Sequence, residues 1–183
     1  MATTTRTRRI ATEDDLRAMP EDGRKYELVD GEIRVSPAGD RHSVVALTLG
    51  ARLLAYVKEH RLGHVMGADA GFRLPSGNVR SPDVSFVAKG RFPNDRPAED
   101  WGSLAPDLAV EVVSPGDRPR YVLDKVGEYL AAGVRLVWVI DPAKQKATIH
   151  RSLTDARTIV GDEILDGEDV VPGFQCRLRD VVE

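Results

Sequence analysis

Two acidic residues occupy positions where the sequence otherwise predicts buried β-strand. Glu111 lies inside the apolar run of residues 108–113, and Asp83 follows Pro82 at the start of a second apolar run. Burying an unpaired carboxylate costs several kcal/mol even after the protein relaxes, so each needs a partner. For a strand carboxylate taken at random, an arginine or a backbone amide is the usual partner. A shared divalent cation is the alternative, because Mg²⁺ often binds through one or two carboxylates together with waters and substrate phosphates.

Lys125 is the third residue that could take part in such chemistry. It lies at the edge of a predicted helical stripe formed by Val122, Val126 and Tyr129, one strand end and one helical turn after Glu111. A lysine in this position often covers apolar surface with its stem and keeps its amine in water. Near two carboxylates and a bound metal, its ammonium could instead orient a water or stabilise the charge of a developing phosphorane. The three side chains together favour metal-assisted hydrolysis of a phosphodiester.

The first third of the chain predicts two helices and a hairpin. A short helix begins after Thr12 and ends before Pro20. Residues 25–35 alternate in character around Asp30-Gly31, which is a strong hairpin signal. Residues 43–60 have mostly helical spacing and predict a long helix that packs on a sheet. The apolar side chains that give this spacing are Val44, Leu47, Leu54 and Val57.

The rest of the chain predicts strands joined by one further long helix. Strand and turn signals recur over residues 67–87. Residues 108–113 and 134–140 are nearly continuous apolar runs, which is typical of strands buried on both faces. Between these runs, Pro119 and Gly133 bound a predicted helix. The predicted fold class is therefore α/β (α+β), with a central mixed β-sheet flanked by helices.

Composition and charge limit the class of protein. The 183 residues are 42% hydrophobic and 30% charged, which predicts one globular domain over residues 1–183, with residues 1–10 as a flexible N-terminus. The lone cysteine, Cys176, cannot form an internal disulfide, so the cytoplasm is the expected location. No stretch approaches the roughly 20 apolar residues that a membrane helix needs, so we expect no membrane partner. The net charge of −3 means that any contact with nucleic acid must be local.

The acidic pair resembles the signature of the restriction-endonuclease-like (PD-(D/E)XK) superfamily. That signature runs Pro-Asp, then Asp or Glu, any residue, and Lys. Pro82-Asp83 and Glu111 match its first two parts, but Val113 stands where the lysine is expected. The Uma2 family of this superfamily places its lysine on the following helix, and Lys125 matches that position.

The chain is similar to the Uma2 family over nearly its whole length. The matching stretches are residues 26–33, 41–42, 80–87, 105–115 and 124–142. The resemblance implies that Asp83 and Glu111 bind a metal and that Lys125 is the catalytic lysine. It also implies that Glu27 is a further acidic residue of the catalytic site and that His42 contacts substrate. Tyr121 departs from the pattern, because relatives more often carry an acidic residue there.

The leading hypothesis is a Mg²⁺- or Mn²⁺-dependent endonuclease acting on nucleic acid, with DNA favoured over RNA. The backbone carbonyl of Val112 is a candidate further metal ligand. Arg118 and Arg120 are candidate phosphate contacts at the start of the helix that carries Lys125. A solvated charged turn explains these two arginines at least as well. The resemblance also makes a homodimer plausible, because cutting a duplex often needs two sites.

Two other functions fit the same residues. One is a non-catalytic nucleic-acid-binding or interaction module that keeps the nuclease fold, which the acidic net charge favours and the retained Lys125 disfavours. The other is hydrolysis of a glycoside by two carboxylates, which metal dependence would distinguish from a nuclease. If Asp83 and Glu111 are held close for a metal, their like charges destabilise the metal-free fold. Asp83→Asn or Glu111→Gln would then leave metal-free stability unchanged or raised.

Overall fold

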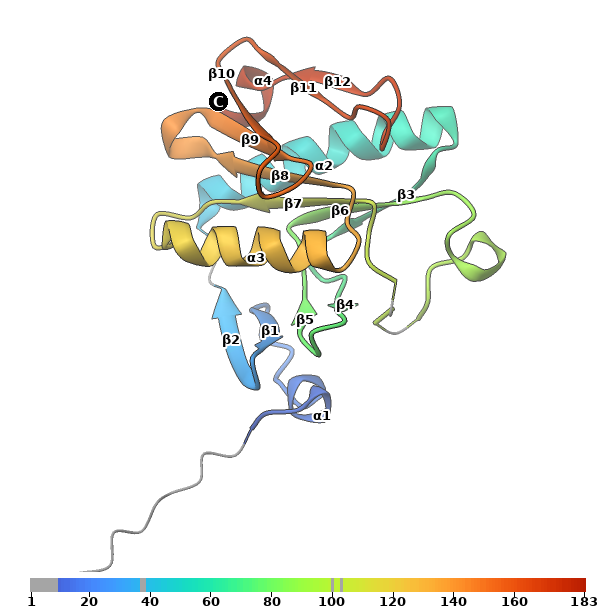
Figure 1. Ribbon diagram of the computed structural model, residues 1–183, viewed down its shortest axis with the longest axis vertical. Coiled ribbons are helices and arrows are strands. Elements are labelled where there is room, and N and C mark those ends of the chain that lie inside the picture. The colour runs from blue at the N-terminus through green and yellow to red at the C-terminus, as the bar shows by residue number, and fades with distance from the viewer. Residues whose placement is uncertain (1–9, 37–38, 100, 103) are drawn as a thin grey trace, which may run out of the picture.

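The computed structural model describes residues 10–36, 39–99, 101–102 and 104–183, and their central feature is a six-stranded sheet in the order β10-β9-β8-β7-β6-β3 (Figure 1). Residues 1–9 of the predicted flexible N-terminus lie outside these ranges. β7 and β8 pair in parallel and the other neighbours pair antiparallel, so the sheet is mixed, as predicted. The strands are β3 (Gly63–Gly67), β6 (Val84–Ala88), β7 (Leu108–Val112), β8 (Leu136–Asp141), β9 (Lys146–His150) and β10 (Ala156–Val160).

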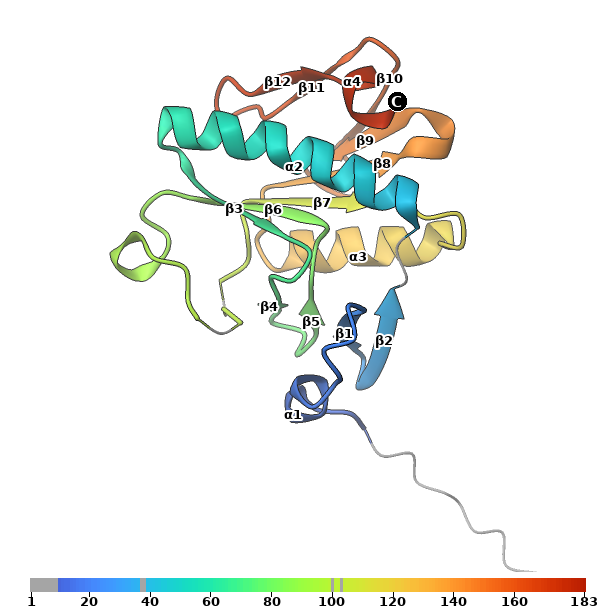
Figure 2. The ribbon, with the colours of Figure 1, turned by 180° about the vertical axis from the view of Figure 1, so that it is seen from behind.

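Two long helices, α2 (Asp40–His60) and α3 (Pro119–Ala131), cover opposite faces of this sheet (Figures 1 and 2). Along β7, Leu108, Val110 and Val112 belong to the core that α2 covers, whereas Ala109 belongs to the core that α3 covers. Successive side chains of a strand point to opposite faces, so Glu111 points toward α3. Every residue of β7 is buried, which agrees with its nearly continuous apolar sequence.

The helix α3 begins and ends where the sequence predicts. Pro119 is its first residue, where the missing N–H costs nothing because no helical acceptor exists for it. Gly133, just after the C-terminal cap, has φ +91°, a left-handed conformation that glycine adopts readily. Lys125, Val126 and Tyr129 form its buried face. The lysine thus points toward the sheet rather than into solvent.

The buried face of α2 differs from the predicted one. The residues in the core are Val45, Leu49, Leu53 and Val57, each four positions after the last. Of the predicted set only Val57 is buried, while Val44, Leu47 and Leu54 are 59%, 74% and 37% exposed. The sequence offers apolar side chains on two neighbouring sides of the helix, so periodicity alone did not determine which side packs on the sheet. The helix also begins at Asp40, earlier than the predicted residue 43.

A second, four-stranded sheet in the order β2-β1-β5-β4 lies beside the main sheet. The predicted hairpin is β1 (Lys25–Val29) and β2 (Glu32–Ser36), joined through Asp30 and Gly31 at φ 51° and 72°. The other two strands, β4 (Phe72–Arg73) and β5 (Val79–Arg80), are short. The predicted short helix α1 (Glu13–Arg17) packs under this sheet through Leu16. Because the chain runs from β5 directly into β6, Pro82-Asp83 lies where the two sheets meet.

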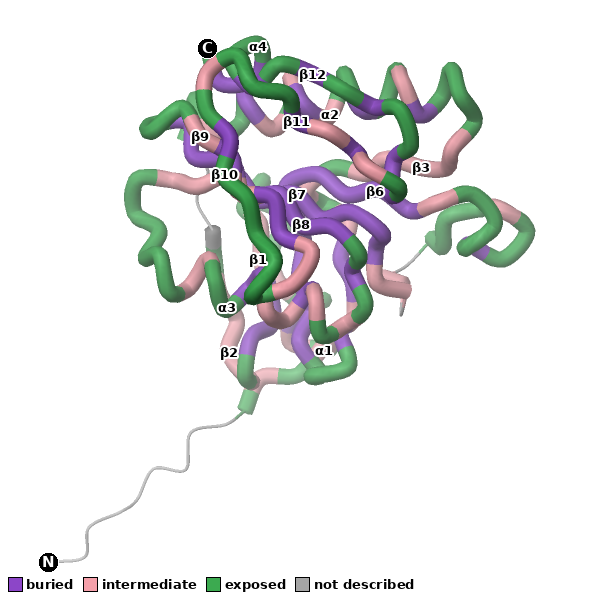
Figure 3. The backbone as a smooth tube through the Cα atoms, turned by 45° about the horizontal axis from the view of Figure 1, so that its top comes forward, coloured by how far each residue is buried: buried purple, intermediate pink, exposed green. Residues whose placement is uncertain are grey.

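The C-terminal part of the chain completes the α2 side of the molecule. Figure 3 shows that β6, β7 and β8 are buried along most of their length, whereas β10 and much of the C-terminal segment are exposed. The remaining elements are β11 (Ile164–Asp166), β12 (Gln175–Arg177), α4 (Arg179–Val182) and the 3-10 turns η1 (Pro93–Asp95) and η2 (Pro142–Lys144). Within the described part of the chain, no helix is both long and apolar enough to cross a membrane.

Candidate active site

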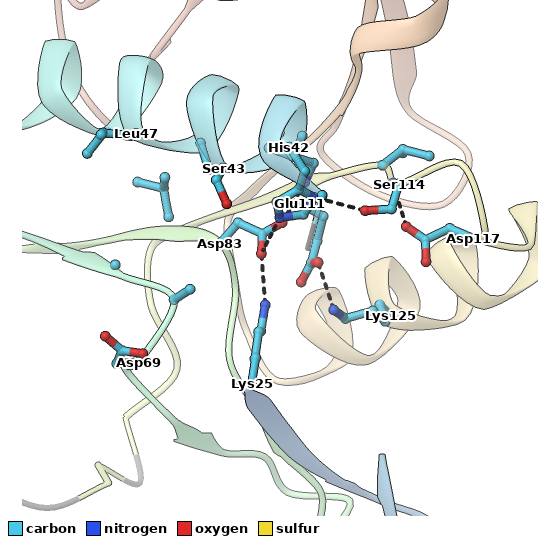
Figure 4. Close-up of a pocket in the computed structure, with 18 of the residues that line it drawn as sticks. Lys25, His42, Ser43, Leu47, Asp69, Asp83, Glu111, Ser114, Asp117 and Lys125 are labelled. Atoms are coloured by element: carbon cyan, nitrogen blue, oxygen red, sulfur yellow. Dashed lines mark hydrogen bonds and ion pairs between the residues drawn. The ribbon is translucent and has the colours of Figure 1, made fainter. Parts of the chain in front are cut away.

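The two carboxylates that the sequence singles out lie side by side on the floor of a cavity. Val84 pairs with Val110, and the N–H of Asp83 donates to the Val110 carbonyl at 2.9 Å. Continuing this register by one residue brings Asp83 opposite Glu111, and opposite residues on antiparallel strands share one face of the sheet. Both line a cavity of about 1440 Å³ bounded by α2, the start of α3 and the β1–β2 hairpin (Figure 4).

Asp83 receives a partner on each of its oxygens. The Val112 N–H donates to Oδ2 at 2.7 Å, Lys25 Nζ donates to Oδ1 at 2.8 Å, and His42 Nε2 lies 3.2 Å from Oδ1. Burial alone would raise the pKa of Asp83, but the hydrogen bond from His42 and the positive charge of Lys25 hold it well below its usual range. Asp83 is therefore an anion in the metal-free protein, and an ammonium already neutralises it.

Lys25 is a site residue that the sequence analysis missed. It is the first residue of β1, and the two-residue period of a strand places it on the same face as Glu27. That spacing was the only sequence signal that Lys25 could belong to the site, and it predicts that Lys25 lies near Glu27 rather than near Asp83. The contact with Asp83 joins residues 58 positions apart, which local patterns do not reveal.

Glu111 is held by two residues of α3. Lys125 Nζ donates to Oε2 at 2.7 Å and Tyr129 Oη donates to Oε1 at 2.6 Å, which fits their spacing of four along one helix face. Burial raises the pKa of Glu111 in spite of Lys125. Burial alone would lower the pKa of Lys125, but attraction to Glu111 and Glu27 outweighs it and raises that pKa. The structure thus brings Lys125 to Glu111, and the lysine stays protonated.

Glu27 lies behind Lys125 and does not line the cavity. Its side chain is 0% exposed, with Lys125 Nζ at 3.5 Å and the Arg80 guanidinium at 3.4 Å. Its Oε1 also accepts from the Ser81 N–H at 3.0 Å. Burial would raise the pKa of Glu27, but the charges of Lys125, Lys25 and Arg80 lower it. The geometry places Glu27 outside the cavity lining, where it can fix Lys125.

Arg80 joins Glu27 to the outer turn of α3. Its guanidinium donates to Glu128 at 2.6 Å and to the Tyr121 hydroxyl at 3.0 Å. Asn78 Nδ2 also donates to Glu128 at 3.0 Å. Tyr121, the departure from the family pattern, therefore supplies a neutral acceptor for Arg80. Burial alone would lower the pKa of Arg80, but these hydrogen bonds and charges raise it.

The predicted phosphate-contacting residues do not all reach the cavity. Arg118 lines it at the start of α3, but Arg120 is exposed and is not part of its lining. His42 lines it from α2 and contacts Asp83 through one ring nitrogen and the Ser114 hydroxyl, at 3.1 Å, through the other. The structure thus groups Arg118 and His42 with the carboxylates and leaves Arg120 outside.

The donor set of the cavity suits Mg²⁺ or Mn²⁺. Among the residues that the structure describes, no cluster of three or more His, Cys, Asp or Glu side chains forms a ready metal cage. Asp83 and Glu111 supply two carboxylates that already attract cations, because each binds a lysine ammonium. Mg²⁺ is commonly bound by one or two carboxylates, with waters and substrate phosphates completing its shell. Two carboxylates facing an open cavity meet that requirement.

Asp83→Asn is expected to lower the stability of the metal-free protein by about 2 kcal/mol at pH 7, because the amide lacks the charge that Lys25 and the Val112 amide stabilise. The folded-state pKa lies below the ordinary value of 3.8, so this stabilisation is full above about pH 4 and is lost as pH falls through the folded-state pKa. Denaturant unfolding of the wild type and of Asp83→Asn in EDTA, at pH 7 and at pH 3, measures the difference in their free energies of unfolding. This difference should be smaller at pH 3. An equal loss at both pH values would contradict it.

Comparison with known proteins gives two findings. The model of the Uma2 family, described as “Putative restriction endonuclease”, matches residues 13–179. A crystal structure of a “putative nuclease belonging to DUF820” from Anabaena variabilis matches with a TM-score of 0.81 and 20% sequence identity, covering 93% of this chain and 97% of that one. No curated protein matches the chain. The structural match confirms the predicted fold class, a central mixed sheet flanked by helices.

Proposed function

Since the chain belongs to the Uma2 family, we propose that it is a metal-dependent endonuclease that hydrolyses phosphodiester bonds of nucleic acid. The observation that carries this proposal is the pair Asp83 and Glu111, brought opposite each other at the cavity floor, with Lys125 bound to Glu111. Carboxylates and a protonated lysine at one point suit a reaction that needs a cation and a fixed positive charge.

Asp83, Glu111 and the carbonyl of Val112 would hold Mg²⁺ or Mn²⁺. When bound, such an ion supplies Lewis-acid polarisation of the phosphate and lowers the pKa of water. The protein's own part is to fix the ligands. The Val112 N–H orients Asp83 through Oδ2, and the Tyr129 hydroxyl orients Glu111 through Oε1.

Lys125 would stabilise the negative charge that develops on the phosphate and orient the attacking water. Its raised pKa keeps it cationic at neutral pH, so it acts as a fixed charge rather than as a general base. Glu27 would be a positioning residue, because it reaches Lys125 from the side away from the cavity. Arg118 and the backbone amides at the start of α3 would attract the phosphates that flank the cut. DNA is our preferred substrate, and cutting both strands of a duplex would use two copies of the chain.

Cleavage of labelled single- and double-stranded DNA and RNA in Mg²⁺, Mn²⁺ or EDTA tests the proposal. We expect cutting that needs the metal and is lost in Asp83→Asn, because the substitution removes a ligand charge. Asp141→Asn is the matched control, because Asp141 ends the neighbouring strand β8, is also buried, and is not part of the cavity lining. Metal-independent hydrolysis would contradict the proposal, and folded protein that binds nucleic acid without cutting it would favour the non-catalytic module.

A further inference from the structure

We propose that Lys25 competes with the metal for Asp83: its ammonium holds Oδ1 in the metal-free protein, leaves that oxygen when a divalent cation binds, and then contacts the substrate phosphate. This inference rests on the proposed function for the identity of its two ligands. Its first test, however, measures metal binding and does not depend on catalysis.

The two oxygens of Asp83 have different roles. Oδ2 accepts from the backbone amide of Val112, which β7 holds in place, so that oxygen is tied to the fold. Oδ1 is the oxygen that two side chains approach, with Lys25 Nζ at 2.8 Å and His42 Nε2 at 3.2 Å. A cation that uses Oδ1 must therefore displace or crowd Lys25, whose flexible stem can move more readily than the Val112 amide.

The charges at the cavity floor and just behind it point to the same competition. Glu27, Asp83 and Glu111 are three acidic groups, and Lys25 and Lys125 lie within 3.5 Å of them. Lys125 is shared between Glu111 and Glu27 from the buried side, so it is constrained. Lys25 bonds to one carboxylate in that group and lines the cavity (Figure 4). It is the ammonium that a divalent cation would replace with the smallest rearrangement.

A displaced Lys25 would lose its direct contact with Asp83 and would face the cavity. A phosphate in that cavity supplies the missing negative charge, and Arg118 at the same cavity adds a second cation for it. Metal and phosphate should therefore bind cooperatively, because the first makes available a cation that the second uses. In the metal-free protein Lys25 is paired with Asp83, so the affinity of the cavity for phosphate should be lower.

Titration calorimetry with Mn²⁺ is the first test. Lys25→Met should bind Mn²⁺ roughly fivefold or more tightly than the wild type, because Asp83 no longer has an internal cation, and its metal-free melting temperature should fall. Lys25→Gln repeats the measurement with an uncharged side chain that can still donate a hydrogen bond, and Lys25→Arg should keep wild-type affinity. Arg24→Met is the matched control, because Arg24 lines the same cavity but lies 3.4 Å from Asp22. Unchanged or weaker Mn²⁺ binding by Lys25→Met and Lys25→Gln, or equal tightening in Arg24→Met, would overturn the proposal.

The second test measures coupling to phosphate. A deoxynucleoside 5′-monophosphate carries the phosphate but has no phosphodiester to cut. Saturating Mn²⁺ should raise its affinity for the wild type by roughly fivefold more than for Lys25→Met, and an equal rise in both proteins would overturn the release of Lys25 to phosphate. If the wild type cuts no nucleic acid while Lys25→Met still tightens Mn²⁺ binding, the proposed nuclease function fails and the competition stands.

Discussion

Glu111→Gln is expected to lower metal-dependent cleavage by roughly 10³-fold or more while leaving the metal-free protein folded. A bound cation contributes several kcal/mol of charge stabilisation in phosphate chemistry, and each ~1.4 kcal/mol is a factor of ten in rate. Glutamine keeps the shape of Glu111 but removes the charge that would attract the ion. Initial rates at saturating Mn²⁺ measure the loss, with Asp141→Asn carried through the same assay as the buried-carboxylate control.

The stability of Glu111→Gln separates a metal ligand from a structural ion pair. Burial raises the folded-state pKa of Glu111 above its ordinary value of 4.5, so the ionised form is costly to the fold. A group with a raised folded-state pKa contributes stability that is full below the unfolded pKa and is lost as pH rises through the folded one. The variant should therefore match or exceed the wild type in melting temperature at pH 7 in EDTA, and this advantage should disappear below about pH 4. A fall of several kcal/mol at pH 7 would instead identify an ion pair on which the fold depends.

The structure shows that the two carboxylates differ, although the sequence predicted the same behaviour for both. Like charge alone predicted the same behaviour for Asp83→Asn and Glu111→Gln. Asp83, however, receives the His42 hydrogen bond and the Lys25 ammonium, which lower its pKa, whereas burial dominates at Glu111. The pKa values of the two neighbouring acids are thus shifted in opposite directions from their usual values. Partners from outside the two strands cause this difference, and the strand sequences do not contain them.

The sequence predicted best where one local pattern had one explanation. The strand β7 is apolar except for Glu111 and is typical of a strand buried on both faces, and α3 carries a proline and a glycine at its two ends. The helix α2 shows the limit. Its apolar residues fall on two adjacent sides, and the choice between them depends on the shape of the sheet, which periodicity does not encode.

The residues of the candidate site likewise fall into those that a local sequence pattern reveals and those that it does not. Asp83, Glu111 and Lys125 could be singled out because each charge interrupts an apolar pattern, and burying a charge requires a reason. Lys25 and Arg80 interrupt nothing, and their importance comes from contacts with residues 58 and 53 positions away. The sequence pattern did not single out Glu27, and only the resemblance to a family suggested that it belongs to the site. Long-range charge pairs are set by the tertiary fold, so they were the part of the site that the sequence did not reveal.

Arg80→Met is expected to destabilise the protein by about 3–5 kcal/mol, the usual cost of removing one partner from a buried ion pair. The Arg80 side chain is 1% exposed, and it faces Glu27 at 0% exposure and Glu128 at 21%. Methionine fills much of the same volume, so the loss would come from charge and hydrogen bonds rather than from a cavity. Glu27 would keep Lys125 and the Ser81 amide but would lose the Arg80 guanidinium. Denaturant unfolding in EDTA measures the difference.

Arg34→Met is the matched control for this prediction. The guanidinium groups of Arg34 and Arg80 lie 5.3 Å and 5.5 Å from the Tyr121 ring, so both substitutions remove a cation from the same aromatic side chain. A partly exposed cation–π contact contributes about 0.5–1 kcal/mol, and Arg34→Met should cost no more than that. Equal losses in the two variants would show that the ring contact, and not the buried carboxylates, determines the effect.

The double variant Glu27→Gln/Arg80→Met tests whether the cost arises at Glu27. If the main penalty of Arg80→Met is a buried anion short of positive charge, neutralising Glu27 removes that penalty. The double variant should then be more stable than Arg80→Met alone by about 0.5–3 kcal/mol, the usual coupling between contacting residues. Because Glu27 also holds Lys125 at 3.5 Å, cleavage by the double variant should stay low even though its fold recovers. Additive losses would mean instead that Arg80 stabilises the protein through Glu128, and that the charge of Glu27 is satisfied by Lys125 and the Ser81 amide alone.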